Sequence, residues 1–592
     1  MAEKIVSPGV FTRENDLSFV PQGVAEIGAA IVGPTVKGPA LVPTVVSSFG
    51  EYSTIFGTTF NSGSDQYEYL TSLAAEQYLQ NAGQLTVVRI LSGSFSNATS
   101  NFLDKSFVPT SESNAQSTST NHSSSFAIKT RFDGAILNST GSQGTNGLLT
   151  NGTENNYRWE ITNVNKNTGT FTLLVRQGND THTNKIILET WNDLSLDPKS
   201  NNYIRRVIGD QRYTIADSTT TDPFLQLTGD YANKSQFIYV SSNQTTIDYL
   251  DENGNTGSLT NALGLYTASL PAAVSGTFKA GSDGAVKAAP KFFDNIANGN
   301  AQGYDPDQDG NTYQTAFRLL KNQDQYDVNM ILAPGIIQQN DSATTTLLKE
   351  VCEARGDAFF IVDPVNHNTT SLATVTGVTE QLITSYGAMY WPWVKIFASR
   401  LGKNVWVPPS VVMGGVIAFN DKVAAEWFAP AGLNRGGIGA AIQAERGLTH
   451  ANRDTLYESR INPLATFPGQ GVCVWGQKTL QKRPTALDRV NVRRLLINLK
   501  KFIASTTKFL VFENNTSTTR NRFLSTVNPY MEQVQQNQGL FAFRVIMDES
   551  NNTPDVIDRN QMKGEIFIQP AKAAEFIIVD FNIMPTGATF GE

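Results

Sequence analysis

The chain has 592 residues, of which 40% are hydrophobic and 17% are charged, and its formal net charge is −7. One hydrophobic core stops growing well below this length, so we expect three or four domains. The hydrophobic content excludes wholesale disorder, and the small acidic surplus argues against a protein held on nucleic acid through phosphate contacts. The two cysteines, Cys352 and Cys473, exclude a disulfide-stapled scaffold.

Residues 1–20 predict an extended arm. Pro8, and Pro21 just after the segment, disfavour a helix. The residues of the arm that suit a β-strand are Ile5, Val6, Val10 and Phe11. So short a segment has no partner of its own to pack against. No apolar run in the chain approaches the ~20 residues that span a bilayer, so we expect no stable membrane insertion.

Residues 21–91 and 280–400 together predict one interrupted α/β domain. In the first stretch, apolar residues three and four apart predict a helix over 66–81. The apolar run over 85–91 then predicts a buried strand. The alternation of helix and strand is typical of an α/β unit.

The second stretch contains the pattern of a βαβ unit. A strand over 326–333, a helix over 343–355 and a strand over 358–362 follow one another at the spacing that such a unit requires. We therefore expect these strands to be parallel and to share the sheet of the first stretch.

Residues 92–279 differ in composition, because Ser, Thr, Asn and Gly dominate them. Islands of alternating apolar and polar residues predict strands at Tyr157–Thr162, Phe171–Arg176, Lys185–Leu188 and Phe237–Val240. We expect one or two β-rich insertion domains here that face outward to solvent.

Residues 401–572 predict an α+β domain whose clearest signal is a helix over 484–512. Thr485 and Asp488 have the spacing of a capping box at its start. Apolar residues fall in one arc of the helix, and a separate cluster contains Arg489, Arg493 and Lys500. The tail that follows, residues 573–592, predicts a second strand-forming arm. Its strand-prone residues include Phe576, Ile578, Phe581 and Ile583.

The basic cluster admits three interpretations. Between Lys478 and Lys508 there are nine basic residues and one acid, Asp488. A solvated helix face normally mixes both signs of charge, so this pattern favours a specific acidic partner over a merely solvated side. Nucleic acid is the competing partner, but no aromatic stacking platform lies beside the charge in the sequence.

One weak metal candidate is present. Asp305, Asp307 and Asp309 match the start of an EF-hand calcium loop, with Gly310 at the sixth position. The twelfth position is Ala316, so the bidentate carboxylate is missing. A polar turn is the preferred interpretation.

Residues 471–479 resemble a phosphate-binding loop with one residue too many before Lys478. The interior of the loop is bulky and apolar, which predicts a strand in place of a phosphate cradle. We predict no enzyme and no cofactor. A nucleotide-binding enzyme that uses this loop is the alternative from another functional class.

Several ordered segments of the C-terminal half resemble the contractile tail sheath proteins of bacteriophages. They are Trp427–Gly437, Asn462–Leu480, Arg483–Arg494, Phe512–Thr516 and Asn551–Asp558, and the Ser7–Val10 opening also fits. The resemblance covers residues 1–90 and 280–592. It leaves out the insertion, as is expected of a family whose outward domains vary.

The resemblance implies a structural subunit that polymerises as a helical array around an inner tail tube and contracts to drive the tube through a host envelope. It implies that both terminal arms add strands to sheets of neighbouring subunits, within an α/β and α+β multidomain fold. By analogy, Arg489, Arg493 and Lys500 face an acidic tube. The implied partners are other copies, the tube, and baseplate and tail terminator proteins, with no direct nucleic acid contact. The implied location is the virion, after assembly in the host cytoplasm. The sheath of a phage-derived bacterial injection device is the alternative within this class.

Overall fold

The computed structural model describes residues 28–63, 65–100, 124–139, 147–165, 167–217, 222–245, 270–271, 273–308 and 312–578. The described chain forms two compact units. One comprises residues 28–498 with 572–578, and the other comprises residues 499–571.

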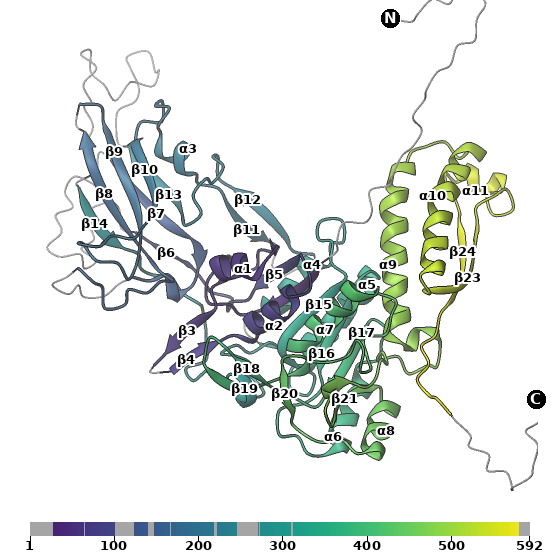
Figure 1. Ribbon diagram of the computed structural model, residues 1–592. Coiled ribbons are helices and arrows are strands. Elements are labelled where there is room, and N and C mark those ends of the chain that lie inside the picture. The colour runs from purple at the N-terminus through teal and green to yellow at the C-terminus, as the bar shows by residue number, and fades with distance from the viewer. Residues whose placement is uncertain are drawn as a thin grey trace, which may run out of the picture. The chain divides into compact units, whose positions relative to one another are not determined.

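An eight-stranded sheet forms the centre of the larger unit (Figure 1). In spatial order its strands are β2 (Thr44–Val46), β5 (Leu85–Arg89), β1 (Ala29–Gly33), β15 (Met330–Ile337), β16 (Phe359–Asp363), β17 (Gly387–Trp391), β21 (Ile461–Phe467) and β22 (Gly471–Val474). The six inner strands are parallel, whereas β2 and β22 run antiparallel to their neighbours. Because β1 pairs with both β5 and β15, strands from either side of the long insertion share one sheet.

Helices cover both faces of this sheet. The helices are α1 (Phe49–Phe56), α2 (Leu70–Leu79) and α7 (Pro409–Val423) on one face, and α4 (Thr312–Leu320), α5 (Ser342–Arg355), α6 (Leu372–Gly377) and α8 (His450–Glu458) on the other. Successive strand residues point to opposite faces, so Ala29 and Ile31 enter one core while Ala30 and Val32 enter the other. A strand that is buried on both faces consists of a continuous run of apolar residues. Such runs are why these strands could be predicted from the sequence.

The predicted βαβ unit is confirmed, since β15 and β16 are parallel and α5 connects them. The predicted helix over 66–81 is wrong in its first turn, because α2 begins at Leu70. The preceding residues form β4 (Asp65–Glu68), which pairs with β3 (Thr59–Ser62) in a hairpin. Aromatic packing favours the hairpin, because the ring of Tyr67 stacks on that of Phe292 with a centroid distance of 4.6 Å.

The insertion forms a β-sandwich (Figure 1). One sheet contains β10 (Ile187–Ser195), β9 (Thr170–Gln177), β8 (Tyr157–Asn165) and β14 (Val274–Thr277), and the other contains β13 (Ile238–Thr245), β7 (Ser124–Asp133) and β6 (Asn97–Thr99). The two inner faces share one core, in which Phe126 of β7 stacks on Phe171 of β9 at 5.4 Å. Three of the four predicted strand islands correspond to β8, β9 and β13. The fourth, Lys185–Leu188, shares only its last two residues with β10, which continues to Ser195.

Three smaller elements accompany the sandwich and the central sheet. The hairpin β11 (Arg212–Ala216) and β12 (Phe224–Thr228) belongs to the insertion, together with helix α3 (Ile204–Ile208). A three-stranded antiparallel sheet contains β19 (Lys403–Val407), β18 (Val394–Ala398) and β20 (Ala441–Ala444). The 3-10 turns are Ala135–Leu137, Phe293–Asn295, Val378–Gln381, Ala486–Asp488 and Lys508–Leu510.

The C-terminal elements are α9 (Val490–Thr507), α10 (Ser517–Gln536), β23 (Leu540–Ile546), α11 (Pro554–Asp558) and β24 (Glu565–Pro570). The predicted helix over 484–512 is therefore real but too long at both ends. Thr485 caps the 3-10 turn through the backbone N–H of Leu487, and Arg489 is extended. The backbone N–H of Val490 donates to the carbonyl of Gln477, which ties this segment to the preceding chain and prevents one continuous helix.

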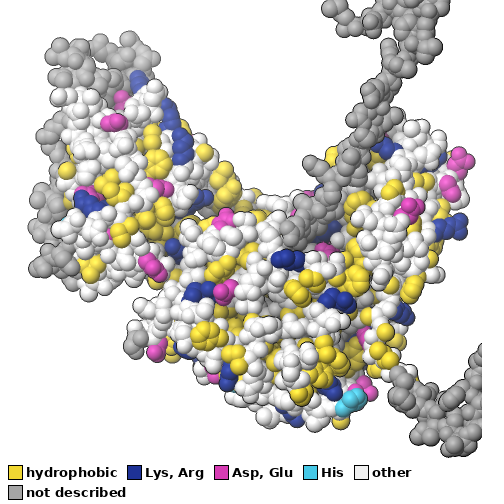
Figure 2. All heavy atoms as spheres, viewed as in Figure 1, with side chains coloured by type: hydrophobic (Ala, Val, Ile, Leu, Met, Phe, Trp, Pro, Cys, Tyr) yellow, Lys and Arg dark blue, Asp and Glu magenta, His cyan; other side chains and the backbone are white. Residues whose placement is uncertain are grey.

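The surface agrees with the low content of charged residues. In the face shown in Figure 2, charged side chains are scattered among uncharged polar and hydrophobic ones. Such a surface has little long-range repulsion between copies of the chain.

Arg89 fastens the insertion to the central sheet. It is the last residue of β5 and is 1% exposed. Its guanidinium donates to the carbonyls of Gly38 at 2.7 Å and Asp133 at 2.6 Å, and further to the carbonyls of the loop after β1. Asp133 ends β7 of the insertion, so one buried cation joins both domains. The carboxylate of Asp283, on the returning segment, lies 3.9 Å from the same guanidinium.

We expect the substitution Arg89→Met to lower the free energy of unfolding by about 3 kcal/mol, because it leaves several buried carbonyls without their donor. Thermal unfolding measures the loss, and limited proteolysis should cleave the joints of the insertion faster. The control is Arg483→Met, because Arg483 is exposed. An unchanged midpoint and unchanged cleavage in Arg89→Met would contradict this role.

Candidate functional site

The carboxyl edge of the parallel sheet is where an α/β fold usually binds ligands, at the point where the strand order reverses. Here that point lies between β1 and β15. Gln302 occupies it and is 1% exposed. Its side-chain oxygen accepts from the backbone N–H of Leu70 at the start of α2 at 2.7 Å, and its amide donates to the carbonyl of Pro334 at 3.3 Å. The side chain of Gln302 therefore accepts the hydrogen bond that a bound phosphate would accept at the N-terminus of α2.

Two further helix ends at this edge are filled in the same way. At α5, Asp307 accepts from the backbone N–H of Thr344 at 2.9 Å. At α7, the carboxylate of Asp363 accepts from the backbone N–H of Ser410 at 2.9 Å and from its hydroxyl. These carboxylates satisfy donors that would otherwise be available to an anionic ligand.

Two of the three residues of the weak metal candidate, Asp305 and Asp307, interact with groups of the chain itself. Asp307 caps α5, and Asp305 lies 3.7 Å from the ammonium of Lys287. Asp309 lies outside the described residues. Within the described ranges, no three His, Cys, Asp or Glu side chains gather in a way that could hold a metal ion.

The segment that resembles a phosphate-binding loop is a strand, as its apolar interior predicts. Gly471–Val474 forms β22, in which Val472, Cys473 and Val474 are buried. The ammonium of Lys478 donates to the carbonyl of Tyr457 and lies 4.3 Å from the centre of its ring. The backbone amides of this segment pair with β21 and do not form a cradle.

The buried carboxyl of Asp363 gives a prediction about pH. Burial raises its pKa to about 7, although Ser410 donates two hydrogen bonds to it. In the unfolded chain an Asp titrates near ~4, so protonation favours the fold, and this contribution is lost as the pH rises through 7. We expect Asp363→Asn, which stays neutral, to gain about 2 kcal/mol of stability relative to the wild type between about pH 5 and about pH 8.

Urea unfolding of both proteins at the two pH values measures this difference. Asp193→Asn serves as the control, because Asp193 is exposed. If the stability difference between Asp363→Asn and the wild type is the same at both pH values, the carboxyl does not titrate as described.

Two members of the predicted basic cluster, Arg489 just before α9 and Arg493 within it, are engaged within the chain. Arg489 donates to the carboxylate of Glu575 with two nitrogens, at 2.7 and 3.0 Å. Arg493 is 4% exposed and lies over the ring of Tyr386, with 4.1 Å between its guanidinium carbon and the ring centre. Lys500 is exposed.

Acids that are missing among the sequence neighbours of this cluster come in part from distant segments of the folded chain. The next arginine, Arg494, pairs with Asp421 of α7, 73 residues earlier, and the side chain of Arg494 is 6% exposed. Together with Glu575, this acid comes from a distant segment. The cations can be recognised in the sequence because they lie close together, on α9 and just before it. Their acidic partners cannot, because Asp421 and Glu575 lie far away along the chain.

The C-terminal arm is held at one residue and exposed beyond it. The carboxylate of Glu575 accepts from Arg489, from the hydroxyl of Tyr457 at 2.8 Å and from the amide of Gln477 at 3.1 Å. The side chains that follow directly are Phe576, Ile577 and Ile578, which are 78%, 83% and 86% exposed. No local sequence pattern marks Glu575 as an anchor, because its three partners lie far away along the chain.

Two of the predicted arm residues, Phe576 and Ile578, are described, and they belong to no strand. The other predicted arm residues, Ile5, Val6, Val10, Phe11, Phe581 and Ile583, lie outside the described residues.

The smaller unit contains a two-stranded sheet. β23 and β24 pair antiparallel, and the buried side of α10 includes Phe523, Val527 and Met531. Phe541 and Phe567 on these strands are 67% and 55% exposed. A sheet of two strands has an edge at each strand, and here α10 packs against β23 and supports the pair. Both edges can accept a further strand.

Comparison with known families identifies the C-terminal half of the chain. Residues 309–480 match the phage tail sheath protein central domain, and residues 482–584 match the phage tail sheath C-terminal domain.

Two relatives agree with this match. The chain is 41% identical over 190 residues to the tail sheath protein of Vibrio phage KVP40, which covers 32% of this chain and 28% of the relative. It is 30% identical over 286 residues to the tail sheath protein of Salmonella phage ViI, covering 47% of this chain and 44% of the relative. The chain thus spans less than half the length of each.

The crystal structure of a sheath tail protein from Listeria innocua superposes with a TM-score of 0.52 at 10% identity, covering 93% of this chain and 96% of that one. This likeness concerns the mixed α/β fold. The relatives named here are structural tail sheath proteins and not enzymes, in agreement with the prediction that the chain is not an enzyme. None of the helices in the described ranges is long and apolar enough to cross a membrane.

Proposed function

We propose that the chain is the structural subunit of a contractile phage tail sheath, because residues 309–480 and 482–584 match the central and C-terminal domains of phage tail sheath proteins. In this role it polymerises as a helical array around an inner tail tube, between a baseplate and a tail terminator, and becomes part of the virion after assembly in the host cytoplasm. A head-to-tail contact that does not close into a ring generates such a helical polymer.

The observation that carries the proposal is the combination of an exposed β-prone arm with a sheet that lacks strands. The exposed part of the C-terminal arm begins at Phe576, which is 78% exposed, and the sheet consists of β23 and β24. In the polymer, the arm of one copy adds a strand to the β23–β24 sheet of another, and residues 1–20 add a second. Strand addition supplies main-chain hydrogen bonds and covers apolar side chains such as Phe541 and Phe567.

Glu575 suits this mechanism because it fixes the root of the arm. Its bonds to Arg489, Tyr457 and Gln477 hold the arm to the rigid domain up to that residue. The strand that follows can then change direction at its root while the subunit moves as a rigid body. Connectivity between copies therefore survives contraction, in which subunits rotate and repack.

Contraction in this proposal has no catalytic step. The helix ends at the carboxyl edge of the sheet are occupied by Gln302, Asp307 and Asp363, which leaves this edge unsuited to nucleotide phosphates. The work comes instead from apolar area newly buried between subunits, at about 25 cal/mol per Å² before the costs of ordering.

The contact with the inner tube is proposed to be electrostatic, with Arg489, Arg493 and Lys500 facing an acidic tube. We expect Lys500 to contribute most to this contact, because Lys500 is exposed whereas Arg493 is buried. Arg489 can contribute only the part of its charge that Glu575 leaves uncompensated. Salt therefore weakens the contact.

For the arm, we expect the double substitution Phe576→Asp and Ile578→Asp to raise the concentration needed for polymerisation by about tenfold or more, because charged side chains oppose burial in a neighbour's sheet. The folded monomer should keep its unfolding midpoint, since both side chains are exposed. Sedimentation and electron microscopy of the purified chain measure the assembly.

The matched control is Phe224→Asp with Ile187→Asp, two side chains that are each 49% exposed and lie on the insertion. Deletion of residues 1–20 should also prevent normal tubes. Polymers with the wild-type threshold in the arm variant would reject strand exchange as the linkage.

For the tube contact, we expect Lys500→Glu to weaken assembly on a preformed tube by about tenfold at low salt, because it reverses a charge that faces acids. Cosedimentation with tubes measures this effect, and assembly without tubes should not change. Lys422→Glu is the control, since Lys422 is exposed on α7. Unchanged cosedimentation of Lys500→Glu would remove the electrostatic contact from the proposal.

A further inference from the structure

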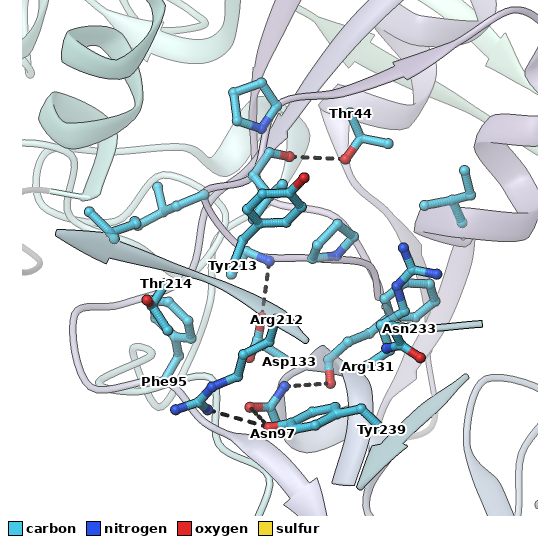
Figure 3. A pocket seen from close by; sticks show the side chains of 18 of the residues that line it. Thr44, Phe95, Asn97, Arg131, Asp133, Arg212, Tyr213, Thr214, Asn233 and Tyr239 are labelled. Carbon is cyan, nitrogen blue, oxygen red and sulfur yellow. Dashed lines mark hydrogen bonds between the residues drawn. The ribbon is translucent and has the colours of Figure 1, made fainter. Parts of the chain in front are cut away.

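A cleft lies at the joint between the insertion and the central domain, within the larger unit (Figure 3). Its walls are the segment 39–45 after β1, the end of β7 and the hairpin of β11 and β12. Its volume is about 1230 Å³. Typical small-molecule pockets hold about 300–1,000 Å³, so this cleft has room for a chain of several linked units.

The cleft is richer in positive charge than the chain as a whole. Lys129 and Arg131 of β7 and Arg212 of β11 line it, whereas the protein carries a net charge of −7. The acids among the lining residues are Asp133 and Glu51. Lys129, Arg131 and Asp133 alternate along β7, so they share one face of the strand.

Both acids have donors within the chain. Asp133 accepts from the backbone N–H of Ala40 at 3.1 Å, and Glu51 accepts from the backbone and hydroxyl of Ser47 at 2.8 Å. Burial raises the pKa of Asp133, which lowers its tendency to carry charge, whereas the hydrogen bonds from Ser47 lower the pKa of Glu51 and keep it charged. Three cations thus face one fully charged acid. The cations Arg131 and Arg212 are exposed. The cleft therefore favours an anionic occupant.

An aromatic platform stands beside these cations. Tyr213 of β11 is 55% exposed and presents its ring to the cleft, whereas Phe95 lies beside Thr214 and packs on the central core (Figure 3). The hairpin that carries Tyr213 is anchored by Ile215 and Leu225, which pack on the central core. A Tyr ring offers a flat apolar face and a polar tip, which suits a ligand that has both kinds of surface.

Planar amide side chains complete the lining. Those open to a ligand belong to Gln211, Asn233 and Gln236. The amide of Asn97 also lines the cleft, but it donates to the carbonyls of Thr130 and Phe132 and accepts from the hydroxyl of Tyr239. The side-chain oxygen of Asn233 is buried and has no hydrogen-bond partner among the described residues. Amides and guanidiniums can bind pairs of adjacent hydroxyl groups with two hydrogen bonds at fixed spacing.

We propose that this cleft binds an anionic oligosaccharide, a chain of sugars that carry carboxylate or phosphate groups. Sugar rings stack with their C–H faces on Tyr213, the acidic groups pair with Arg131 and Arg212, and the amides receive the hydroxyls. A single-stranded nucleic acid fits less well, because it needs successive aromatic platforms for successive bases. Its binding is one of the outcomes that the test separates.

Isothermal titration of the full chain with hexagalacturonate tests the proposal, with maltohexaose as the neutral sugar and a thymidine hexanucleotide as the nucleic acid. We expect the acidic sugar to bind at least about tenfold more tightly than either, with the affinity falling as salt increases. Arg131→Gln and Tyr213→Ala should each weaken this binding about tenfold, and Tyr213→Phe should retain it.

Two substitutions serve as matched controls. Arg483→Gln removes an exposed arginine away from the cleft lining, and Phe224→Ala removes an exposed ring from the same hairpin. Neither should change the affinity. Unfolding midpoints show whether each variant is folded, and Lys129→Gln is the second cation variant if Arg131→Gln is not.

Three results would overturn the proposal. Absence of binding to hexagalacturonate up to about 10 mM would show that the cleft does not take acidic sugars. Tighter binding of the hexanucleotide would assign the cleft to nucleic acid. A loss of affinity in Arg131→Gln without any loss in Tyr213→Ala would reduce the cleft to a basic patch that does not recognise sugar rings.

Discussion

The buried guanidinium of Arg89 is the constraint on which the arrangement of the larger unit depends. Its donors reach the carbonyls of the loop after β1 and of Asp133 in the insertion, so the sheet end and the sandwich are joined through one charge. A buried cation is tolerated only where its donors are satisfied, and these carbonyls satisfy them. The cleft lies at this joint. Its shape therefore follows from the same contact that lets a long insertion interrupt a sheet without disrupting it.

The edge of the sheet at which an α/β enzyme usually binds its ligand is filled by the chain's own side chains, whereas β-prone segments at the C-terminal end are exposed. At the carboxyl edge of the sheet, the helix ends are occupied by the chain's own Gln302, Asp307 and Asp363. At the C-terminal end, β23 and β24 form a sheet of two strands, and Phe576 to Ile578 are exposed. Soluble proteins usually protect strand edges and apolar strands of this kind. Their presence here agrees with a chain that is completed by other copies.

Part of this could be predicted from the sequence, because some signals are local. The βαβ unit around α5, the strand at Gly471–Val474 and the strands of the insertion follow from periodicity and from apolar runs. The start of α2 and the start of α9 could not, because β4 pairs with β3 and because Val490 bonds to Gln477. Pairing with a neighbouring segment outweighed local propensity at both boundaries.

The sequence alone determined the two-sided burial of the central strands, the contiguous cations of α9 and the strand-prone tail, since each is a property of neighbouring residues. Only the tertiary structure decided which charges are compensated. Asp421 pairs with Arg494 of α9, Glu575 pairs with Arg489 just before α9, and Gln302 reaches the sheet edge from the far side of the insertion. Electrostatic and hydrogen-bond energies depend on the distance between the groups in space. The separation of two residues along the chain does not predict that distance.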